Sequence, residues 1–220
     1  FEKVETMLFY CDDTAALQQA RAEEWLPLLP DWRGRQALGY RNILDQNLCA
    51  AAYLLLRFAC AQNGFYELPG FQYGENGKPF FSPEGERLQF NLSHCCEGAA
   101  CGIAKTAIGV DMQELVDDYE ALWDMVCSAG EKRWIRCSGE PVRAFTKLWA
   151  MKEAYVKCLG SGLGDALPQL DFSAFLGQWG AFRQHVFSVW DIEKAVLVQC
   201  TKEMDARLVR VPYERLLLQS

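Results

Sequence analysis

The segment with the clearest chemical potential is Trp149-Ala150-Met151-Lys152-Glu153-Ala154-Tyr155-Val156-Lys157. If it is helical, Trp149, Glu153 and Lys157 fall at positions i, i+4 and i+8, along one stripe of the helix. An exposed Glu–Lys pair at this spacing contributes only a few tenths of a kcal/mol. The tryptophan on the same stripe indicates a partly shielded face, and charges on a shielded face need charged partners. A divalent cation and a phosphate group would supply them.

Asp111 is the second residue with a chemical signature, because it follows the apolar strand-like residues Ile108-Gly109-Val110. Taken alone, a strand-end aspartate is more typical of a cap for the next helix. Together with Glu153, however, it matches Mg²⁺, which takes one or two carboxylates and leaves its other positions to water and substrate phosphate. Lys157, one turn after Glu153, would then meet a phosphate oxygen as a point charge.

A third group of polar residues consists of Lys78, Ser93 and His94. Residues 88–92 alternate apolar and polar, which predicts a half-buried strand with Ser93 away from the apolar face and His94 at its end. All three side chains can donate to phosphate, although each also suits an ordinary loop or turn. Neighbours on a strand point to opposite faces, so Ser93 and His94 make a poor nucleophile–base pair and a hydrolase is disfavoured.

The elements that must position these residues follow an α+β order. Helical spacing of apolar residues predicts a long helix over 44–59, with Gly64 as its stop, and a second helix over 145–159 that ends before Gly160. Strands are expected at 88–92 and 99–104 as a hairpin, at 107–112, and at 185–190, 195–201 and 207–211 as consecutive antiparallel strands. Residues 70–85, rich in Gly and Pro, are expected to form a loop.

This order predicts a pseudo-twofold pair of similar α+β halves, residues 1–105 and 106–220, joined near Thr106. The second half would carry the metal site. The cleft between two such halves is the natural position for a binding site.

Composition fits a folded domain rather than a disordered or fibrous chain. The 220 residues are 50% hydrophobic and 23% charged, with 22 basic and 29 acidic side chains and a net charge of −7. The acidic total argues weakly against nucleic-acid binding. The densest apolar run, residues 48–61, is interrupted by Arg57, so we expect no membrane span. Ten cysteines without a CxxC pair, and only two histidines, support zinc poorly; reduced thiols in a cytoplasmic protein without a secretory leader are expected.

Four segments together resemble the 4′-phosphopantetheinyl transferases, in particular the large, monomeric type that activates peptide synthetases. They are Gly77-Lys78-Pro79, Phe90-Asn91-Leu92-Ser93-His94, Gly109-Val110-Asp111, and the segment from Trp149 to Lys157 with its continuation Gly160-Ser161-Gly162-Leu163. The resemblance implies two similar α+β halves with Mg²⁺ and coenzyme A bound between them. It also implies transfer of the 4′-phosphopantetheine arm to a serine of an acyl or peptidyl carrier protein, with release of adenosine 3′,5′-bisphosphate.

The resemblance also implies individual roles. Asp111 and Glu153 would hold Mg²⁺, and Lys157 would stabilise charge as the phosphate bond breaks. Lys152 would join the residues that bind coenzyme A, and the remaining members of that group are Arg41, Lys78, Ser93 and His94, with Arg41 and His94 at the 3′-phosphate. Glu131 falls where the family places the carboxylate that takes the serine proton; a helix-start glutamate is an equally good interpretation.

One position departs from the family pattern. Many relatives carry an acidic residue two positions after the first metal ligand, where this chain has Gln113. Glu114 should point away from Asp111 if the strand continues, so Gln113 would bind the metal through its carbonyl or through water. The departure leaves open an alternative function: a catalytically weakened relative that binds coenzyme A or a carrier protein. Neither a nucleic acid nor a membrane is expected as a partner, and a monomer is expected.

Overall fold

The computed structural model describes residues 5–68, 70–82, 88–162, 167–174, 176, 181–204 and 206–218. The strands are β1 (Met7–Cys11), β2 (Phe71–Tyr73), β3 (Pro79–Phe81), β4 (Gln89–Cys95), β5 (Gly98–Ala104), β6 (Ile108–Glu114), β7 (Ala181–Phe182), β8 (His185–Ile192), β9 (Ala195–Thr201) and β10 (Arg207–Arg210). The α-helices are α1 (Thr14–Gln19), α2 (Ala22–Trp25), α3 (Asp31–Leu38), α4 (Ile43–Gln62), α5 (Trp123–Val126), α6 (Ala129–Arg136), α7 (Pro141–Leu159) and α8 (Tyr213–Leu217). Short 3-10 helices are η1 (Leu26–Leu28), η3 (Tyr119–Leu122) and η4 (Leu167–Gln169).

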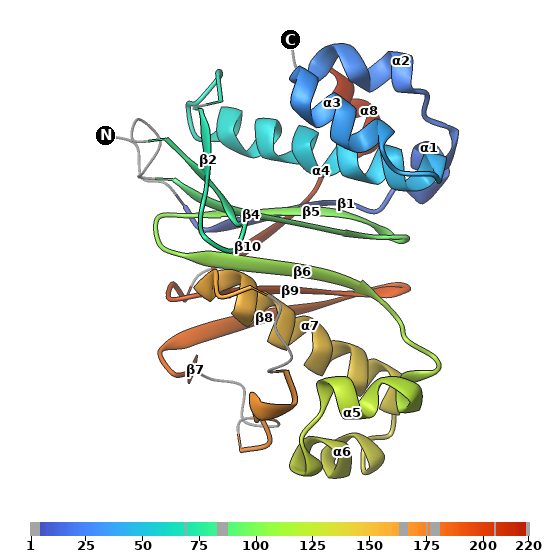
Figure 1. Ribbon diagram of the computed structural model, residues 1–220, viewed down its shortest axis with the longest axis vertical. Helices are drawn as coiled ribbons and strands as arrows, with labels where there is room; N and C mark the ends of the chain where they lie inside the picture. The colour runs from blue at the N-terminus through green and yellow to red at the C-terminus, as the bar shows by residue number, and fades with distance from the viewer. Residues whose placement is uncertain are drawn as a thin grey trace.

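Two four-stranded sheets lie face to face between two long helices (Figure 1). The first sheet has the order β10-β1-β5-β4 and is covered by α4; the second has the order β6-β9-β8-β7 and is covered by α7. Each sheet with its helix, and the shorter helices around it, is called a half below. This arrangement confirms the predicted α+β class.

Helix α4 is the core helix of the first half, as its apolar periodicity predicts. Its cap is Asn42, whose side chain accepts a hydrogen bond from the Leu44 amide at 2.9 Å. By length and composition α4 also passes as a membrane-crossing helix, but 72% of its most apolar window is buried inside the protein. Helix α4 is therefore mostly buried in the core of the first half.

The two sheets share a small apolar core and a polar seam. Side chains of both sheets, among them Leu8, Val110 and Leu197, pack between them. Along the edge strands, the Asn91 side chain on β4 accepts from the Val110 amide on β6 at 2.7 Å, and the Ser93 hydroxyl accepts from the Met112 amide at 3.1 Å. The polar face of the predicted strand therefore holds the halves together.

Three expectations need correction. Residues 71–81, expected in a loop, contain the hairpin of β2 and β3, turned at Gly77 with φ 76°. The strand over 207–211 is not antiparallel to β9; β10 runs parallel to β1 in the first sheet. Val211, Tyr213 and Leu216 join the apolar core of the first half, so the second half is not the continuous segment 106–220. Periodicity finds a strand but does not identify its partner.

Candidate active site

Asp111 lies at the seam, in the middle of β6, and is only 3% exposed. Its Oδ1 atom accepts from Lys157 Nζ at 2.5 Å and from the Ser93 hydroxyl at 3.1 Å. Its Oδ2 atom is buried and has no hydrogen-bond partner among the described residues. A buried carboxylate oxygen without a partner is costly, and a bound cation would satisfy it.

Glu153 and Lys157 reach the same point from α7. Lys157 Nζ lies 3.5 Å from Glu153 Oε2, so its ammonium group lies between the two carboxylates. Burial opposes the charge on Lys157, but Asp111 and Glu153 outweigh it, and the pKa of Lys157 is raised above its ordinary value. The spacing along α7 thus brings Glu153 and Lys157 to Asp111, as predicted, although Asp111 lies in the middle of β6 and not at a strand end.

Trp149 completes the stripe in a way that the sequence did not reveal. Its indole Nε1 donates to Glu153 Oε1 at 2.9 Å, while its ring packs against Phe145 at 5.8 Å between centroids. The tryptophan therefore fixes the orientation of the Glu153 carboxylate. The spacing showed that the two side chains share a face, but not that the indole donates to the acid.

These residues fit a divalent cation. Asp111 and Glu153 converge on the ammonium of Lys157, which marks a position of negative potential, and Asp111 Oδ2 still lacks a partner. Among the described residues, no group of three or more His, Cys, Asp or Glu side chains is arranged to hold a metal ion, so the protein would supply two carboxylates. That number suits Mg²⁺. Gln113 shares the strand face of Asp111 and is half-buried; its contact with a metal stays a prediction.

Lys78 is placed differently from the expectation. Its ammonium donates to the carbonyls of Ile108, Lys157 and Cys158 at 2.9, 2.6 and 3.2 Å. An ammonium group has three donors, and all three are used here. Burial lowers the pKa of Lys78, against the opposing effect of Cys158 and Cys200. Lys78 therefore fastens the β2–β3 hairpin to β6 and to the end of α7, and the geometry does not support a direct phosphate contact.

His94 faces a cavity on the other side of β4. The cavity has a volume of about 270 Å³, and its lining includes Arg33, Tyr40 and Tyr53 beside His94. Burial, then Arg33, lowers the pKa of His94, with Lys157 adding to the effect and Asp45 opposing it. Arg33 was missed at the sequence level: it lies on α3 and its buried Nε has no partner among the described residues. Arg41 is exposed just before α4.

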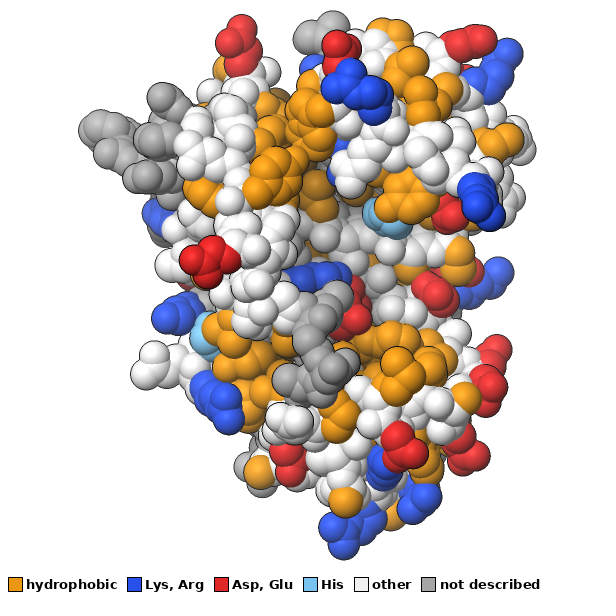
Figure 2. Space-filling view, viewed as in Figure 1, with side chains coloured by type: hydrophobic (Ala, Val, Ile, Leu, Met, Phe, Trp, Pro, Cys, Tyr) orange, Lys and Arg blue, Asp and Glu red, His pale blue; other side chains and the backbone are white. Residues whose placement is uncertain are grey.

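A second cavity adjoins the first. It measures about 190 Å³, and its lining includes Asn76, Lys157 and Gly160. The two cavities share Gly77, Pro79 and Asn91 as lining residues. Figure 2 shows this face hollowed between the halves, with apolar side chains on the upper rim and basic and acidic groups on the floor. The hollow leads from His94 to Lys157, whose ammonium group pairs with Asp111 and Glu153.

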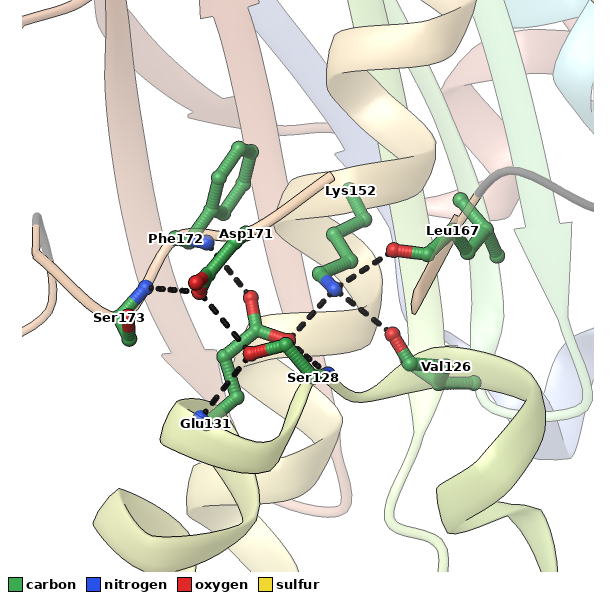
Figure 3. Close-up of polar contacts among 8 residues, drawn as sticks. All are labelled: Val126, Ser128, Glu131, Lys152, Leu167, Asp171, Phe172 and Ser173. Carbon is green, nitrogen blue, oxygen red and sulfur yellow. Dashed lines mark hydrogen bonds and ion pairs between the residues drawn. The ribbon is translucent and has the colours of Figure 1, made fainter. Parts of the chain in front are cut away.

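Glu131 and Lys152 lie elsewhere, in the interior of the second half (Figure 3). Both side chains are 0% exposed, and Lys152 Nζ donates to Glu131 Oε2 at 2.7 Å. Glu131 forms a capping box with Ser128 at the start of α6. The structure thus contradicts a base role for Glu131 and a coenzyme A contact for Lys152, because neither group reaches the surface. The alternative interpretation, a helix-start glutamate, agrees with the geometry.

Residues 107–202 match the family model described as the 4′-phosphopantetheinyl transferase superfamily. The 4′-phosphopantetheinyl transferase gsp of Aneurinibacillus migulanus is 28% identical over 130 residues, 56% of this chain and 53% of that protein. The 4′-phosphopantetheinyl transferase AcpT of Salmonella typhimurium is 36% identical over 98 residues, 42% of this chain and 50% of that protein. The 4′-phosphopantetheinyl transferase psf-1 of Bacillus pumilus is 27% identical over 175 residues, 77% of this chain and 72% of that protein.

The match to the first two of these relatives spans about half of their length. The segment matched by the family model contains Asp111, Glu153 and Lys157, the residues that converge at the seam. Through residues 107–202, the chain is therefore similar to the 4′-phosphopantetheinyl transferase superfamily.

Proposed function

We propose that this protein transfers the 4′-phosphopantetheine arm of coenzyme A to a serine hydroxyl of an acyl or peptidyl carrier protein. The observation that carries the proposal is the convergence of Asp111, Glu153 and Lys157 at the seam, beside a hollow that continues to His94. An anionic, elongated substrate suits a hollow that has cationic groups along its length.

The reaction is a phosphoryl transfer. The serine oxygen forms a bond to the phosphorus that bears pantetheine, the bridging P–O bond breaks, and adenosine 3′,5′-bisphosphate leaves. Mg²⁺ held by Asp111 and Glu153 would neutralise charge on the pyrophosphate oxygens. Lys157 contributes a positive charge where the leaving group becomes negative.

Glu153 is the carboxylate better placed to meet the serine. Its side chain is 17% exposed, against 4% for Asp111. We assign it the second role of accepting or relaying the serine proton, since the buried Glu131 does not reach the hollow. The Trp149 indole binds Oε1 of this carboxylate, and Oε2 faces Lys157.

The remaining parts of the proposal are a Mg²⁺ cofactor, a monomer and a cytoplasmic location. Two carboxylates beside a phosphate-bearing substrate support the metal. Packing of both halves within one chain supports a monomer. All ten cysteines are free thiols, which supports a reducing compartment. Replacement of Mg²⁺ by Ca²⁺ or Mn²⁺ tests the metal, and gel filtration tests the monomer.

The central experiment mixes the protein with coenzyme A, Mg²⁺ and an apo carrier protein, and follows the carrier by mass spectrometry. The expected result is a mass gain equal to the phosphopantetheine arm, abolished by a chelator. A complex that forms without any mass gain would favour the weakened binding module instead.

A further inference from the structure

Every polar side-chain atom of the buried pair Glu131 and Lys152 has a hydrogen-bond partner. Lys152 Nζ donates to Glu131 Oε2, to the Val126 carbonyl at 2.7 Å and to the Leu167 carbonyl at 2.8 Å. An ammonium group has three donors, so no donor is left for a ligand. Figure 3 shows these contacts.

Both carboxylate oxygens of Glu131 also accept hydrogen bonds from the backbone. Its Oε2 atom also accepts from the Ser128 amide at 2.7 Å, and its Oε1 atom accepts from the Phe172 amide at 2.7 Å. Ser128 and the Phe172 segment are in turn linked, because the Ser128 hydroxyl donates to Asp171 Oδ1 at 2.9 Å. Five separate segments therefore meet at one ion pair: the end of α5, the start of α6, α7, η4 and residues 171–173.

Charges in a protein interior are expensive unless they are paired and fully hydrogen-bonded, and apolar residues could have filled the same space. The position of Lys152 suggests what the pair contributes. Lys152 directly precedes Glu153 on α7, and successive residues of a helix point about 100° apart. While Lys152 is held in the interior, Glu153 must face the seam, and Lys157 follows one turn later on the same side as Glu153.

A second contact, made by Phe172, holds the same helix. The Phe172 ring packs edge-on against Tyr155 of α7, with centroids 6.1 Å apart, and Lys152 Nζ lies 6.0 Å from that ring. The amide of Phe172 is bound by Glu131. Loosening the ion pair therefore also loosens the packing of Tyr155, between Glu153 and Lys157.

We propose that the Glu131–Lys152 pair is a positioning device that sets the rotation of α7, so that Glu153 and Lys157 face Asp111 and bind the metal and the pyrophosphate of coenzyme A. The inference rests on the proposed function. It replaces the base role of Glu131 with a role in assembling the binding site, before any carrier protein arrives.

Binding of coenzyme A with Mg²⁺, measured by calorimetry without a carrier protein, separates the two roles. A general base takes no part in this binding. For Glu131→Gln and Lys152→Met we expect the affinity for coenzyme A in Mg²⁺ to fall by about tenfold or more, as for other residues that orient metal ligands. The double variant should lose far less than the product of the two single losses, because the pair acts as a unit.

A matched control is available on the surface of the same half. Asp124 is exposed and pairs with Lys132, so Asp124→Asn removes one charge of an ion pair without touching the interior; its affinity for coenzyme A should equal that of the unaltered protein. Circular dichroism at the assay temperature confirms that each variant is folded. If a variant is unfolded, Ser128→Ala tests the same network, because it removes only the hydroxyl contacts; a weakened affinity is again expected.

The outcomes are distinct. Normal coenzyme A binding by folded Glu131→Gln, combined with a fall in kcat of about 10²–10⁴, would identify Glu131 as a base and overturn the inference. Where Ser128→Ala serves as the test, normal binding by that variant would overturn the inference as well. Failure of the unaltered protein to bind coenzyme A in Mg²⁺ would overturn the proposed function, and this inference with it.

Discussion

At the scale of single residues, the negative charge of Glu153 is the first property to test. Glu153→Gln keeps an oxygen for the Trp149 indole but removes the charge that faces Lys157. We expect transfer to fall by at least about 10²–10³, with little change in the melting temperature. Single-turnover assays across a Mg²⁺ range measure this, and normal turnover at saturating Mg²⁺ would remove Glu153 from the ligand set.

Trp149 allows the orientation of that ligand to be tested separately from its charge. Trp149→Phe keeps an aromatic ring beside Phe145 but deletes the donor to Glu153 Oε1. We expect the Mg²⁺ concentration for half-maximal activity to rise by about 10–100-fold. Trp134→Phe, on α6 of the same core, is the control and should leave the Mg²⁺ dependence unchanged. Equal Mg²⁺ curves for both variants would show that the indole hydrogen bond has no role.

His94 gives a pH dependence whose sign follows from its surroundings. Its pKa in the folded protein lies below the ordinary value of 6.5, chiefly because of burial, so between the two values the unfolded chain binds more protons. Stability should therefore fall as the pH falls below 6.5, and His94→Gln should reduce that fall in urea unfolding. Added coenzyme A should raise the His94 pKa in NMR titrations; an unchanged pKa would place the phosphate elsewhere.

At the scale of secondary-structure elements, the site depends on the close approach of β6 to α7. A Cβ atom at Gly109 would lie 1.9 Å from the Ala154 carbonyl oxygen and 2.4 Å from the Cys158 amide nitrogen. Both are backbone atoms of the helix, so Gly109→Ala must push the strand away. We expect a loss of about 1–3 kcal/mol in urea unfolding and a loss of transfer, since Asp111 moves with β6.

Gly139→Ala is the matched control for this change. No atom lies within 4 Å of the Cβ position at Gly139, so both stability and activity should stay within error of the unaltered protein. A Gly109→Ala variant that is stable but inactive would show that the contact serves the site alone. A variant that is active but unstable would show that it serves the fold alone.

How far the sequence could predict the site depends on the length of the side chains involved. Glu153 and Lys157 were predictable as neighbours because residues four apart share one face of a helix. Asp111, 46 residues before Lys157, was joined to them only through the metal ion that two carboxylates would share. Lys78, Lys152 and Glu131 were not predictable, because apart from the Ser128 cap their partners lie more than 14 residues away: each other's side chain for Lys152 and Glu131, and otherwise backbone groups. Local patterns do not show which carbonyl group a long side chain reaches.

The same limit holds for the elements. Long helices such as α4 and α7 carry enough periodicity to be found, and β4 and β5 follow one another as a hairpin. The β2–β3 hairpin has only three residues in each strand, within a segment rich in Gly and Pro. Neighbouring strands are usually paired, which favoured β9 as the partner of β10; the observed partner, β1, is about 200 residues away.

At the scale of the whole molecule, the C-terminal segment ties the first half to the end of the chain. Leu216 is 0% exposed and packs in the core of the first half, beside Val211 and Tyr213, whereas Leu218, two residues later, is 79% exposed. Leu216 and Leu218 therefore give a matched test of which half the C-terminal segment stabilises. Had the chain divided at residue 106, Leu216 would have stabilised the second half only.

Leu216→Ala should therefore lower the free energy of unfolding by about 2–5 kcal/mol, while Leu218→Ala should change it by less than about 0.5 kcal/mol. Hydrogen exchange followed by mass spectrometry locates the effect: protection should fall first in α4 and β1, not in β8 and β9. Because the two sheets share an apolar core and the Asn91–Ser93 seam, we also expect one cooperative unfolding transition. Equal effects of the two leucine substitutions, or exchange confined to β8 and β9, would contradict the assignment of the C-terminal segment to the first half.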